Sequence, residues 1–90
     1  MHAGVVKVTI NDAERAEAGL HEQVVPNVSQ APGFVAGYWM RSDDNTGMSV
    51  VVFESEENAR GFAQRMESEG PPNDAVTVDS VEVREVVASA

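Results

Sequence analysis

The stretch from Gly33 to Phe53 constrains the fold most, because it predicts a β-hairpin that is apolar on both faces. Side chains of a strand alternate between the two faces of its sheet. In the first arm the two sets are Val35, Gly37 and Trp39 on one face, and Phe34, Ala36, Tyr38 and Met40 on the other. The second arm divides into Met48, Val50 and Val52 against Ser49, Val51 and Phe53. A hairpin with one face in water would carry polar residues there, so we expect both faces to be covered.

Two more strands and two helices surround this hairpin. Alternating apolar residues predict a strand over Val5–Ile10, and helical spacing predicts helices over Asp12–Ser29 and Ser55–Glu69. A valine-rich segment predicts the last strand over Val76–Val87, with a bulge near Asp79-Ser80 where the alternation changes phase. The order βαββαβ with right-handed crossovers predicts a ferredoxin-like fold: a four-stranded antiparallel sheet with two helices on one face.

Short local signals predict where these elements begin and turn. Asn11 and Glu14 have the spacing of a capping box, and Ser55 is suited to cap the second helix. Pro26 lies late in the first helical pattern and predicts a kink or a loosened turn there. Gly47 can supply the positive φ that the hairpin loop needs.

The acidic composition excludes several classes of partner. The 90-residue chain has a formal net charge of −9, which repels phosphate backbones and anionic lipid headgroups. We therefore expect no nucleic-acid partner and no membrane partner. Cysteine is absent, which excludes disulfides, thiolate nucleophiles and cysteine-based metal sites. One domain over residues 1–90 is expected, and a cytoplasmic location is the default because no secretion signal or membrane span is apparent.

Two helices can cover only one face of the predicted sheet, so the sequence implies a partner for the other. Leaving a large apolar side chain in water forgoes about 1.5–3 kcal/mol. Several such side chains together approach the whole stability of a small domain, about 5–15 kcal/mol. Exposed patches of that size mark interfaces. We expect a homodimer in which two sheets pack face to face about a two-fold axis.

The element order, the Pro32-Gly33-Phe34 turn leading into an aromatic strand, and the run Val51–Glu57 before the second helix together resemble the dimeric α+β-barrel superfamily. The likeness is strongest to the antibiotic-biosynthesis-monooxygenase-like proteins, many of which are small actinobacterial chains. This resemblance implies a dimer whose sheets close into a barrel, with a ligand pocket between sheet and helices in each subunit. Some members oxidise polyaromatic substrates without a prosthetic group, and relatives degrade haem.

The resemblance also bears on individual residues. Active members use an Asn in the first strand, where this chain has Thr9, and a Trp facing the pocket, for which Trp39 is the candidate. Haem-degrading relatives use an axial His on the second helix, and Ser55–Glu69 contains none. The two histidines, His2 and His21, are not spaced as a metal-ligand pair. We therefore expect no cofactor and no metal.

Five residues are candidates for a functional site. Trp39 and Tyr38 can stack on a flat aromatic ligand, although one can instead fill the core and the other the dimer interface. His21 and Thr9 are candidates for a catalytic polar contact, because histidine exchanges protons near neutral pH; His21 can equally be a surface residue. Arg41 can anchor a ligand carboxylate, or it can be a loop charge paired with a neighbouring aspartate.

The sequence leaves two functions open. The first is a cofactor-independent, monooxygenase-like enzyme acting on a hydrophobic or aromatic small molecule. The second is a non-catalytic dimeric module of the same fold that binds a ligand or a protein partner, which the scarcity of catalytic side chains favours. The sequence alone leaves open whether the protein is an enzyme.

Overall fold

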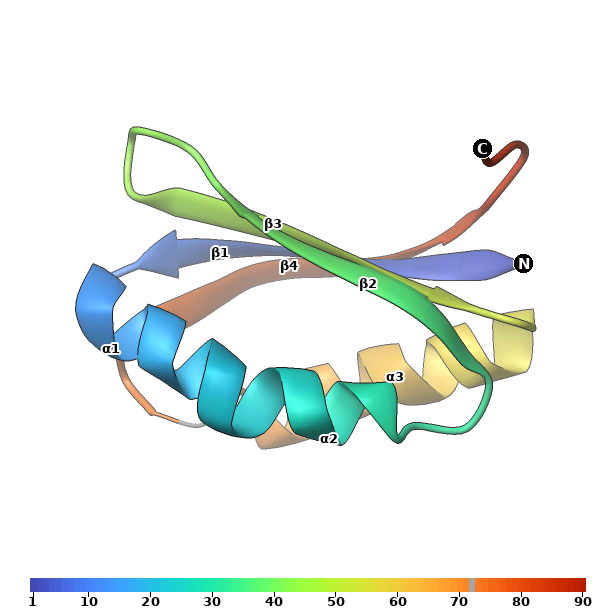
Figure 1. Cartoon of the computed structure of the whole chain (residues 1–90), viewed down its shortest axis with the longest axis horizontal. Coiled ribbons are helices and arrows are strands. Elements are labelled where there is room, and N and C mark those ends of the chain that lie inside the picture. The colour runs from blue at the N-terminus through green and yellow to red at the C-terminus, as the bar shows by residue number, and fades with distance from the viewer. Residues whose placement is uncertain (72) are drawn as a thin grey trace.

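The computed structural model describes residues 1–71 and 73–90, and its elements follow the predicted βαββαβ order (Figure 1). The strands are β1 (His2–Ile10), β2 (Phe34–Arg41), β3 (Thr46–Phe53) and β4 (Val76–Glu85). The helical segments are α1 (Ala13–Gly19), η1 (Leu20–Val24), α2 (Val25–Ser29) and α3 (Glu56–Glu69). The strands form one antiparallel sheet in the order β2-β3-β1-β4. The predicted ferredoxin-like fold is confirmed.

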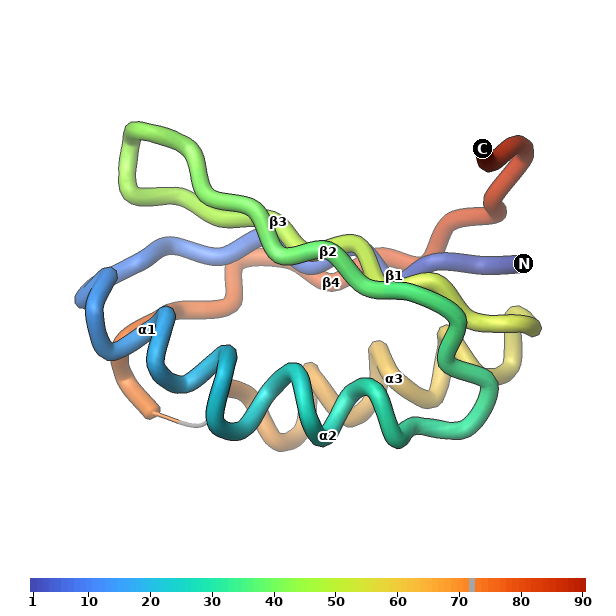
Figure 2. The backbone as a smooth tube through the Cα atoms, viewed as in Figure 1, coloured from blue at the N-terminus to red at the C-terminus, as the bar shows by residue number. Residues whose placement is uncertain are grey.

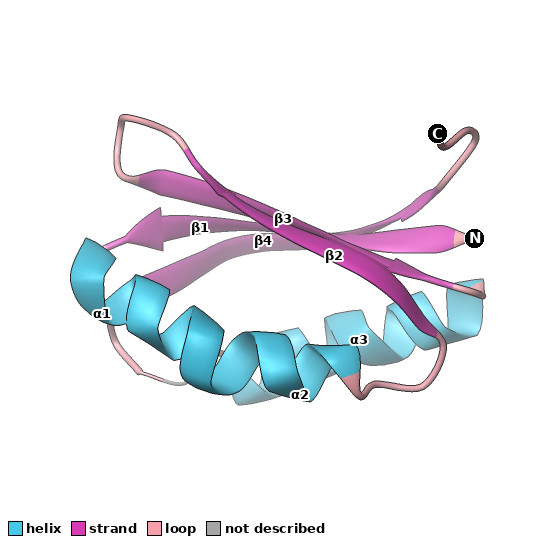
Figure 3. Cartoon of the chain, viewed as in Figure 1, coloured by secondary structure: helices cyan, strands magenta, loops and turns pink. Residues whose placement is uncertain are grey.

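The helices lie on one face of the sheet (Figure 3). The other face, which no described helix covers, is the bare or open face of the sheet. The core fills the space between the sheet and the helices. Val51 and Phe53 of β3 and Ala59 of α3 are fully buried there. The Phe53 ring lies edge-on to Phe34 with centroids 6.4 Å apart, and its centroid is 5.4 Å from that of Phe62. This aromatic cluster ties the hairpin to α3.

The bare face is apolar around the hairpin, as predicted. Tyr38 and Met40 of β2 are 62% and 50% exposed on it, and Met48 of β3 is 39% exposed. Val50 and Val52 share this face with Met48, because β3 alternates regularly. The sheet therefore presents a surface of large apolar side chains that no helix covers.

Two bulges set which side chains reach each face. In β4 the register with β1 shifts so that Lys7 pairs with Ser80 and Val8 with Val78, which leaves Asp79 as the extra residue. This bulge is the predicted one. A second bulge, at Val35 in β2, was not predicted. It turns Phe34 onto the helix-covered face together with Gly37 and Trp39, so the assignment of Phe34 to the set containing Tyr38 was wrong.

The first helix runs continuously from α1 to α2 (Figure 2). Its middle segment, η1, is π-helical. In η1 the N–H of Val25 donates to the carbonyl of Leu20, five residues earlier. Pro26 follows immediately; it has no N–H, and its ring crowds the carbonyl four residues before it. A π-turn widens the coil at that carbonyl. The disturbance predicted at Pro26 therefore lies one turn upstream of it.

The first helix is capped one residue later than predicted. The side chain of Asp12, not Asn11, accepts a hydrogen bond from the Arg15 N–H at 3.2 Å. Asn11 instead donates through Nδ2 to the Asp74 carbonyl at 3.1 Å and to Thr77 Oγ1 at 3.0 Å. The amide thus joins β1 to the start of β4. The Ser55 cap is confirmed, because its hydroxyl accepts from the Asn58 N–H at 3.1 Å.

The hairpin loop takes its positive φ at Asn45 (63°) rather than at Gly47. The hydroxyls of Ser42 and Thr46 both donate to Asp44 Oδ1, at 2.6 and 2.5 Å. These bonds hold the pKa of the Asp44 carboxyl below its ordinary value of 3.8. The loop is therefore organised around its own aspartate.

Within the described part of the chain, no helix is long and apolar enough to cross a membrane.

Candidate ligand cavity

A cavity of about 430 Å³ lies between the helix-covered face of the sheet and the first helix. Its walls come from every strand, from α1, η1 and the start of α2, and from the turn after α3. Most of the wall is aliphatic, as with Val8 and Ile10 of β1, Leu20 and Val24 of η1, and Val78 of β4. A hollow of this size and composition suits a small hydrophobic molecule.

The cavity has a buried floor and an exposed rim. Val6 and Ser49 form part of the floor and are 2% and 8% exposed. The rim carries charged and titratable groups: the Glu17 and His21 side chains are 65% and 75% exposed, and Arg41 is exposed at the end of β2. A ligand would thus pass from polar groups at the rim to an apolar interior.

Trp39 lines this cavity, and its ring packs against the backbone at Gly37. A Cβ at Gly37 would lie 2.8 Å from Cη2 and from Cζ3 of Trp39, closer than any real side chain allows. The missing side chain therefore lets the indole lie flat along β2, facing the first helix. Of the five predicted site residues, the structure brings Trp39, His21 and Arg41 to one cavity.

Tyr38 and Thr9 lie elsewhere, which corrects their predicted roles in the pocket. Tyr38 precedes Trp39 in a strand, so it projects from the opposite, open face and cannot line the same cavity. Thr9 is on that open face too, between the cavity-lining Val8 and Ile10. Its hydroxyl donates to Asp79 Oδ2 at 2.7 Å and so holds the β4 bulge.

Ser49 is a cavity residue that the sequence reasoning did not single out. It pairs directly with Trp39 of β2 on one side and with Val6 of β1 on the other. The residue is 8% exposed, and its hydroxyl, which makes no hydrogen bond to another described residue, is open to the cavity. The sequence carries one signal for this residue: Ser49 is polar, although it lies on the same face of its strand as the apolar Val51 and Phe53.

Arg41 is available to a ligand because it has no ion pair with another described residue. Three of the other arginines are paired: Arg15 with Asp74 at 2.9 Å, Arg60 with Glu56 at 3.2 Å, and Arg84 with Glu82 at 2.6 Å. Asp43 and Asp44 were the aspartates considered as its partner. Neither is in an ion pair with it, and Asp44 accepts hydrogen bonds from two hydroxyls. The rim thus holds a guanidinium that is in no ion pair with a described carboxylate, and Glu17 lies at the same rim.

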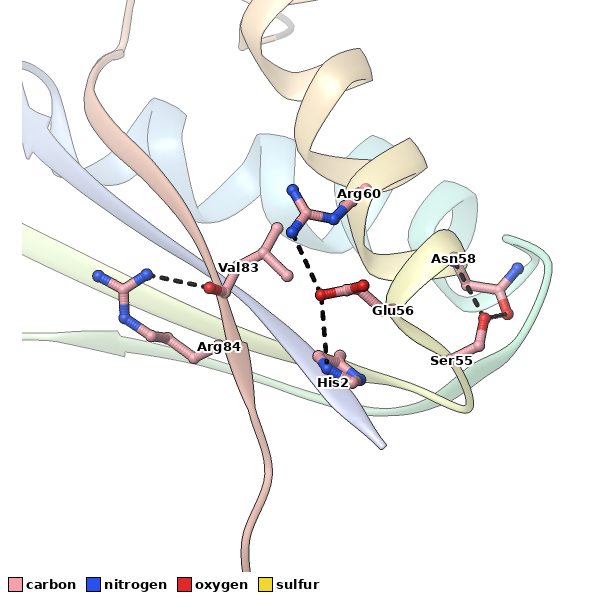
Figure 4. Close-up of polar contacts among 7 residues, drawn as sticks. All are labelled: His2, Ser55, Glu56, Asn58, Arg60, Val83 and Arg84. Carbon is pink, nitrogen blue, oxygen red and sulfur yellow. Dashed lines mark hydrogen bonds and ion pairs between the residues drawn. The ribbon is translucent and has the colours of Figure 1, made fainter.

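A second polar cluster lies at the opposite end of the sheet, where α3 begins (Figure 4). Glu56 Oε2 is 3.2 Å from Arg60 Nη2 and 3.8 Å from His2 Nε2. His2 belongs to β1, where it pairs with Phe53 of β3. Over the described residues no three His, Cys, Asp or Glu side chains are grouped as metal ligands.

A broader, shallower hollow of about 770 Å³ runs along β4 and the end of α3. None of the five predicted site residues lines it. It is open to solvent along an edge strand, so it offers less burial to a small molecule than the cavity beneath Trp39.

The four-stranded sheet and the two helices on one face give this chain a ferredoxin-like fold, with a pocket between sheet and helices. Solved structures share this fold over nearly their whole length. A variant of MhuD with two manganese protoporphyrin IX molecules bound per active site is 18% identical, with a TM-score of 0.71, covering 100% of this chain and 98% of its own. MhuD from Mycobacterium tuberculosis is a heme-degrader that has also been solved with two hemes in its active site.

Two further structures extend the comparison. SnoaB, a cofactor-independent oxygenase from Streptomyces nogalater, is 16% identical with a TM-score of 0.69, covering 98% of this chain and 94% of its own. A dimeric ferredoxin-like protein from an uncultured marine organism is 11% identical with a TM-score of 0.60, covering 100% and 98%. No protein-family model matches the sequence, and no curated protein matches it significantly. At these identities the likeness establishes the fold.

Proposed function

We propose that the protein is a homodimeric, cofactor-independent oxygenase that acts on a hydrophobic aromatic small molecule held beneath Trp39. The observation that carries this proposal is the 430 Å³ cavity with an indole wall, an aliphatic lining and polar groups at its rim. Small-molecule sites occupy roughly 300–1,000 Å³ and combine such a lining with a few polar groups. The shared fold with SnoaB, a cofactor-independent oxygenase, supports the reaction class.

Without a cofactor, the substrate itself must supply the electrons that reduce O2. A methylene flanked by aryl rings, as in anthrone, can do so: CH2 becomes C=O, one atom of O2 enters the product and the other leaves as water. Removing one proton first gives a delocalised anion that transfers an electron to O2. The protein then needs only a proton acceptor, a cation near the developing charge and a dry aromatic site.

The residues at the rim suit these roles. His21 is proposed as the proton acceptor, with its Nε2 lying 3.9 Å from Glu17 Oε1, a carboxylate that can stabilise the resulting imidazolium. Arg41, unpaired among the described residues, is proposed to stabilise the anion. Trp39 and the aliphatic wall would exclude water and align the rings of the substrate. Thr9 has no part in this scheme because it lies on the open face.

Haem does not fit this cavity in the way that an axially ligated iron requires. His21 is the one histidine among the described residues that line it, and its side chain is at the rim, 75% exposed. The floor offers Val6 and Ser49 instead of an imidazole. Haem therefore has no part in the proposed reaction, although MhuD binds it on the same fold.

The homodimer is proposed from the bare sheet face. Tyr38, Met40 and Met48 leave too much apolar surface in water for a small domain, and a second copy of the same surface would cover it. The marine ferredoxin-like protein with this fold is described as dimeric. A single domain over residues 1–90, a cytoplasmic location, and the lack of nucleic-acid and membrane partners stay predictions from composition.

Oxygen uptake with anthrone tests the function. We expect catalysed uptake with formation of anthraquinone that carries one atom from labelled O2. Trp39→Ala should lower kcat/KM at least tenfold, because it removes the wall that aligns the substrate. Tyr38→Phe, the aromatic control on the other face, should leave it unchanged. Binding without turnover would instead assign the non-catalytic module, and neither binding nor turnover would reject the proposal.

A further inference from the structure

We propose that Ser49 determines the specificity of the cavity by hydrogen-bonding one oxygen substituent, a carbonyl or phenolic hydroxyl, on the aromatic ligand. The ligand would then enter with this oxygen innermost and stack along Trp39. This inference rests on the proposed function for the class of ligand, but it concerns recognition and not oxygen chemistry.

The first observation is that Ser49 lies in the buried floor of the cavity and its hydroxyl has no protein partner. Among the described residues the one fully enclosed, unbonded side-chain atom is His2 Nδ1, so the Ser49 oxygen stays open to the cavity. The residue is 8% exposed, and no other described residue accepts or donates a hydrogen bond to its Oγ. Buried polar groups in folded proteins are nearly always bonded. Ser55, which is partly buried, follows that rule, because its hydroxyl donates to Asn58 Oδ1 at 2.7 Å. Ser49 is therefore suited to a partner that comes from outside the chain.

The second observation is where the hydroxyl lies. Directly paired residues of antiparallel strands have Cβ atoms about 4.5–5.5 Å apart. Ser49 is paired in this way with both Trp39 and Val6, on the central part of the sheet. A planar molecule stacked on the indole would thus bring one edge to the serine. Because the surrounding floor is aliphatic, one position of the ligand is offered a hydrogen bond.

The consequence is a fixed orientation. In anthrone the methylene stands opposite the carbonyl across the central ring. With the carbonyl at Ser49 on the floor, the methylene points to the rim, where His21 and Arg41 lie. One serine would therefore place the acidic C–H next to the proposed base. An analogue without the oxygen would leave the hydroxyl unpaired and would lack this orientation.

A pair of ligands under argon tests the inference without any turnover. Anthrone and 9,10-dihydroanthracene share a tricyclic skeleton, and only the first carries the oxygen. The chain has a single tryptophan, so quenching of its fluorescence reports occupancy of the cavity directly. We expect the wild type to bind anthrone about five- to tenfold more tightly, as one hydrogen bond predicts.

Ser49→Ala should abolish this preference and bring the two dissociation constants within twofold of each other. Ser80→Ala, a strand serine on the opposite face, should keep the wild-type ratio. Thermal unfolding of ligand-free Ser49→Ala should match the wild type, because the hydroxyl has no protein partner to lose.

The inference is overturned if Ser49→Ala keeps the preference, if it weakens both ligands equally, or if the wild type binds neither. The oxygenase proposal is tested separately, by the uptake of oxygen. A serine-dependent preference without oxygen uptake would keep this inference and reject the enzyme.

Discussion

Trp39 of β2 and Ser49 of β3 stand directly opposite each other across the hairpin, and both face the cavity under the first helix. Their immediate neighbours in the chain, Tyr38 and Met48, project from the other face and are 62% and 39% exposed. One hairpin therefore builds two surfaces. The inner one is proposed to bind the ligand, and the outer one to bind a second copy of the chain.

The packing of the Trp39 indole against Gly37 predicts the first mutational effect. Gly37→Ala would place a methyl group 2.8 Å from the Trp39 ring, so the ring must move into the cavity. We expect anthrone affinity to fall about tenfold or more, equivalent to at least about 1.4 kcal/mol, with a shifted tryptophan emission spectrum. Fluorescence titration measures both.

Gly61→Ala is the matched control for this substitution. A Cβ at Gly61 meets nothing within 4 Å, and the residue lies within α3. Alanine should therefore stabilise the helix by about 0.5–1 kcal/mol and leave the ligand affinity as it is. Equal losses of affinity in both variants would contradict the packing of the indole against Gly37.

The buried aromatic cluster predicts a large effect on stability. Phe53 is fully buried against Phe34 and Phe62, so Phe53→Ala should lower the free energy of unfolding by about 3–5 kcal/mol. Val87 is 88% exposed, and Val87→Ala should change the free energy of unfolding by less than about 0.5 kcal/mol. Urea denaturation at one fixed protein concentration compares them, because a dimer makes stability depend on concentration. A loss below 1 kcal/mol in Phe53→Ala would place the core elsewhere.

The hairpin loop predicts a pH dependence. The Ser42 and Thr46 hydroxyls favour the ionised Asp44 carboxylate, so its pKa in the folded protein is lower than 3.8. A lowered pKa means that the carboxylate contributes stability above pH 3.8, and that this contribution is lost as pH falls through the folded value. Carbon-detected NMR titration should show Asp44 titrating below 3.8, and Ser42→Ala should move it upward. A midpoint at or above 3.8 in the wild type would be inconsistent with these bonds.

The open face predicts the oligomeric state. Sedimentation at micromolar concentration should show a homodimer, and Met48→Lys should convert it to a monomer because a charge would be buried in the interface. Gln64→Lys, an exposed change on α3, should remain dimeric. A folded, stable wild-type monomer would reject the proposed pairing of sheets.

Hydrophobic periodicity was sufficient to predict the elements, their order and the β4 bulge. The valines of β4 change phase at Asp79-Ser80, and that change is visible in the sequence. The bulge at Val35 has no such mark, because residues on both sides of it are apolar. Which face each hairpin residue occupies was therefore undecided, although Tyr38 and Trp39 had to face apart.

The candidate site was predicted only in part for the same reason. Trp39, His21 and Arg41 were identified by residue type, and all three reach the cavity. Thr9 was identified by its position in the first strand, but alternation places it on the open face. Ser49 was passed over because a single serine in a strand carries no motif. Its role depends on burial and on a missing partner, which only the assembled sheet reveals.

A crystal structure of the protein soaked anaerobically with anthrone tests the central claim most directly. We predict density for one molecule in the cavity, stacked on Trp39, with its carbonyl oxygen within about 2.5–3.0 Å of Ser49 Oγ. Ligand bound on the open face, in the hollow along β4, or in the cavity with its oxygen away from Ser49 would contradict it.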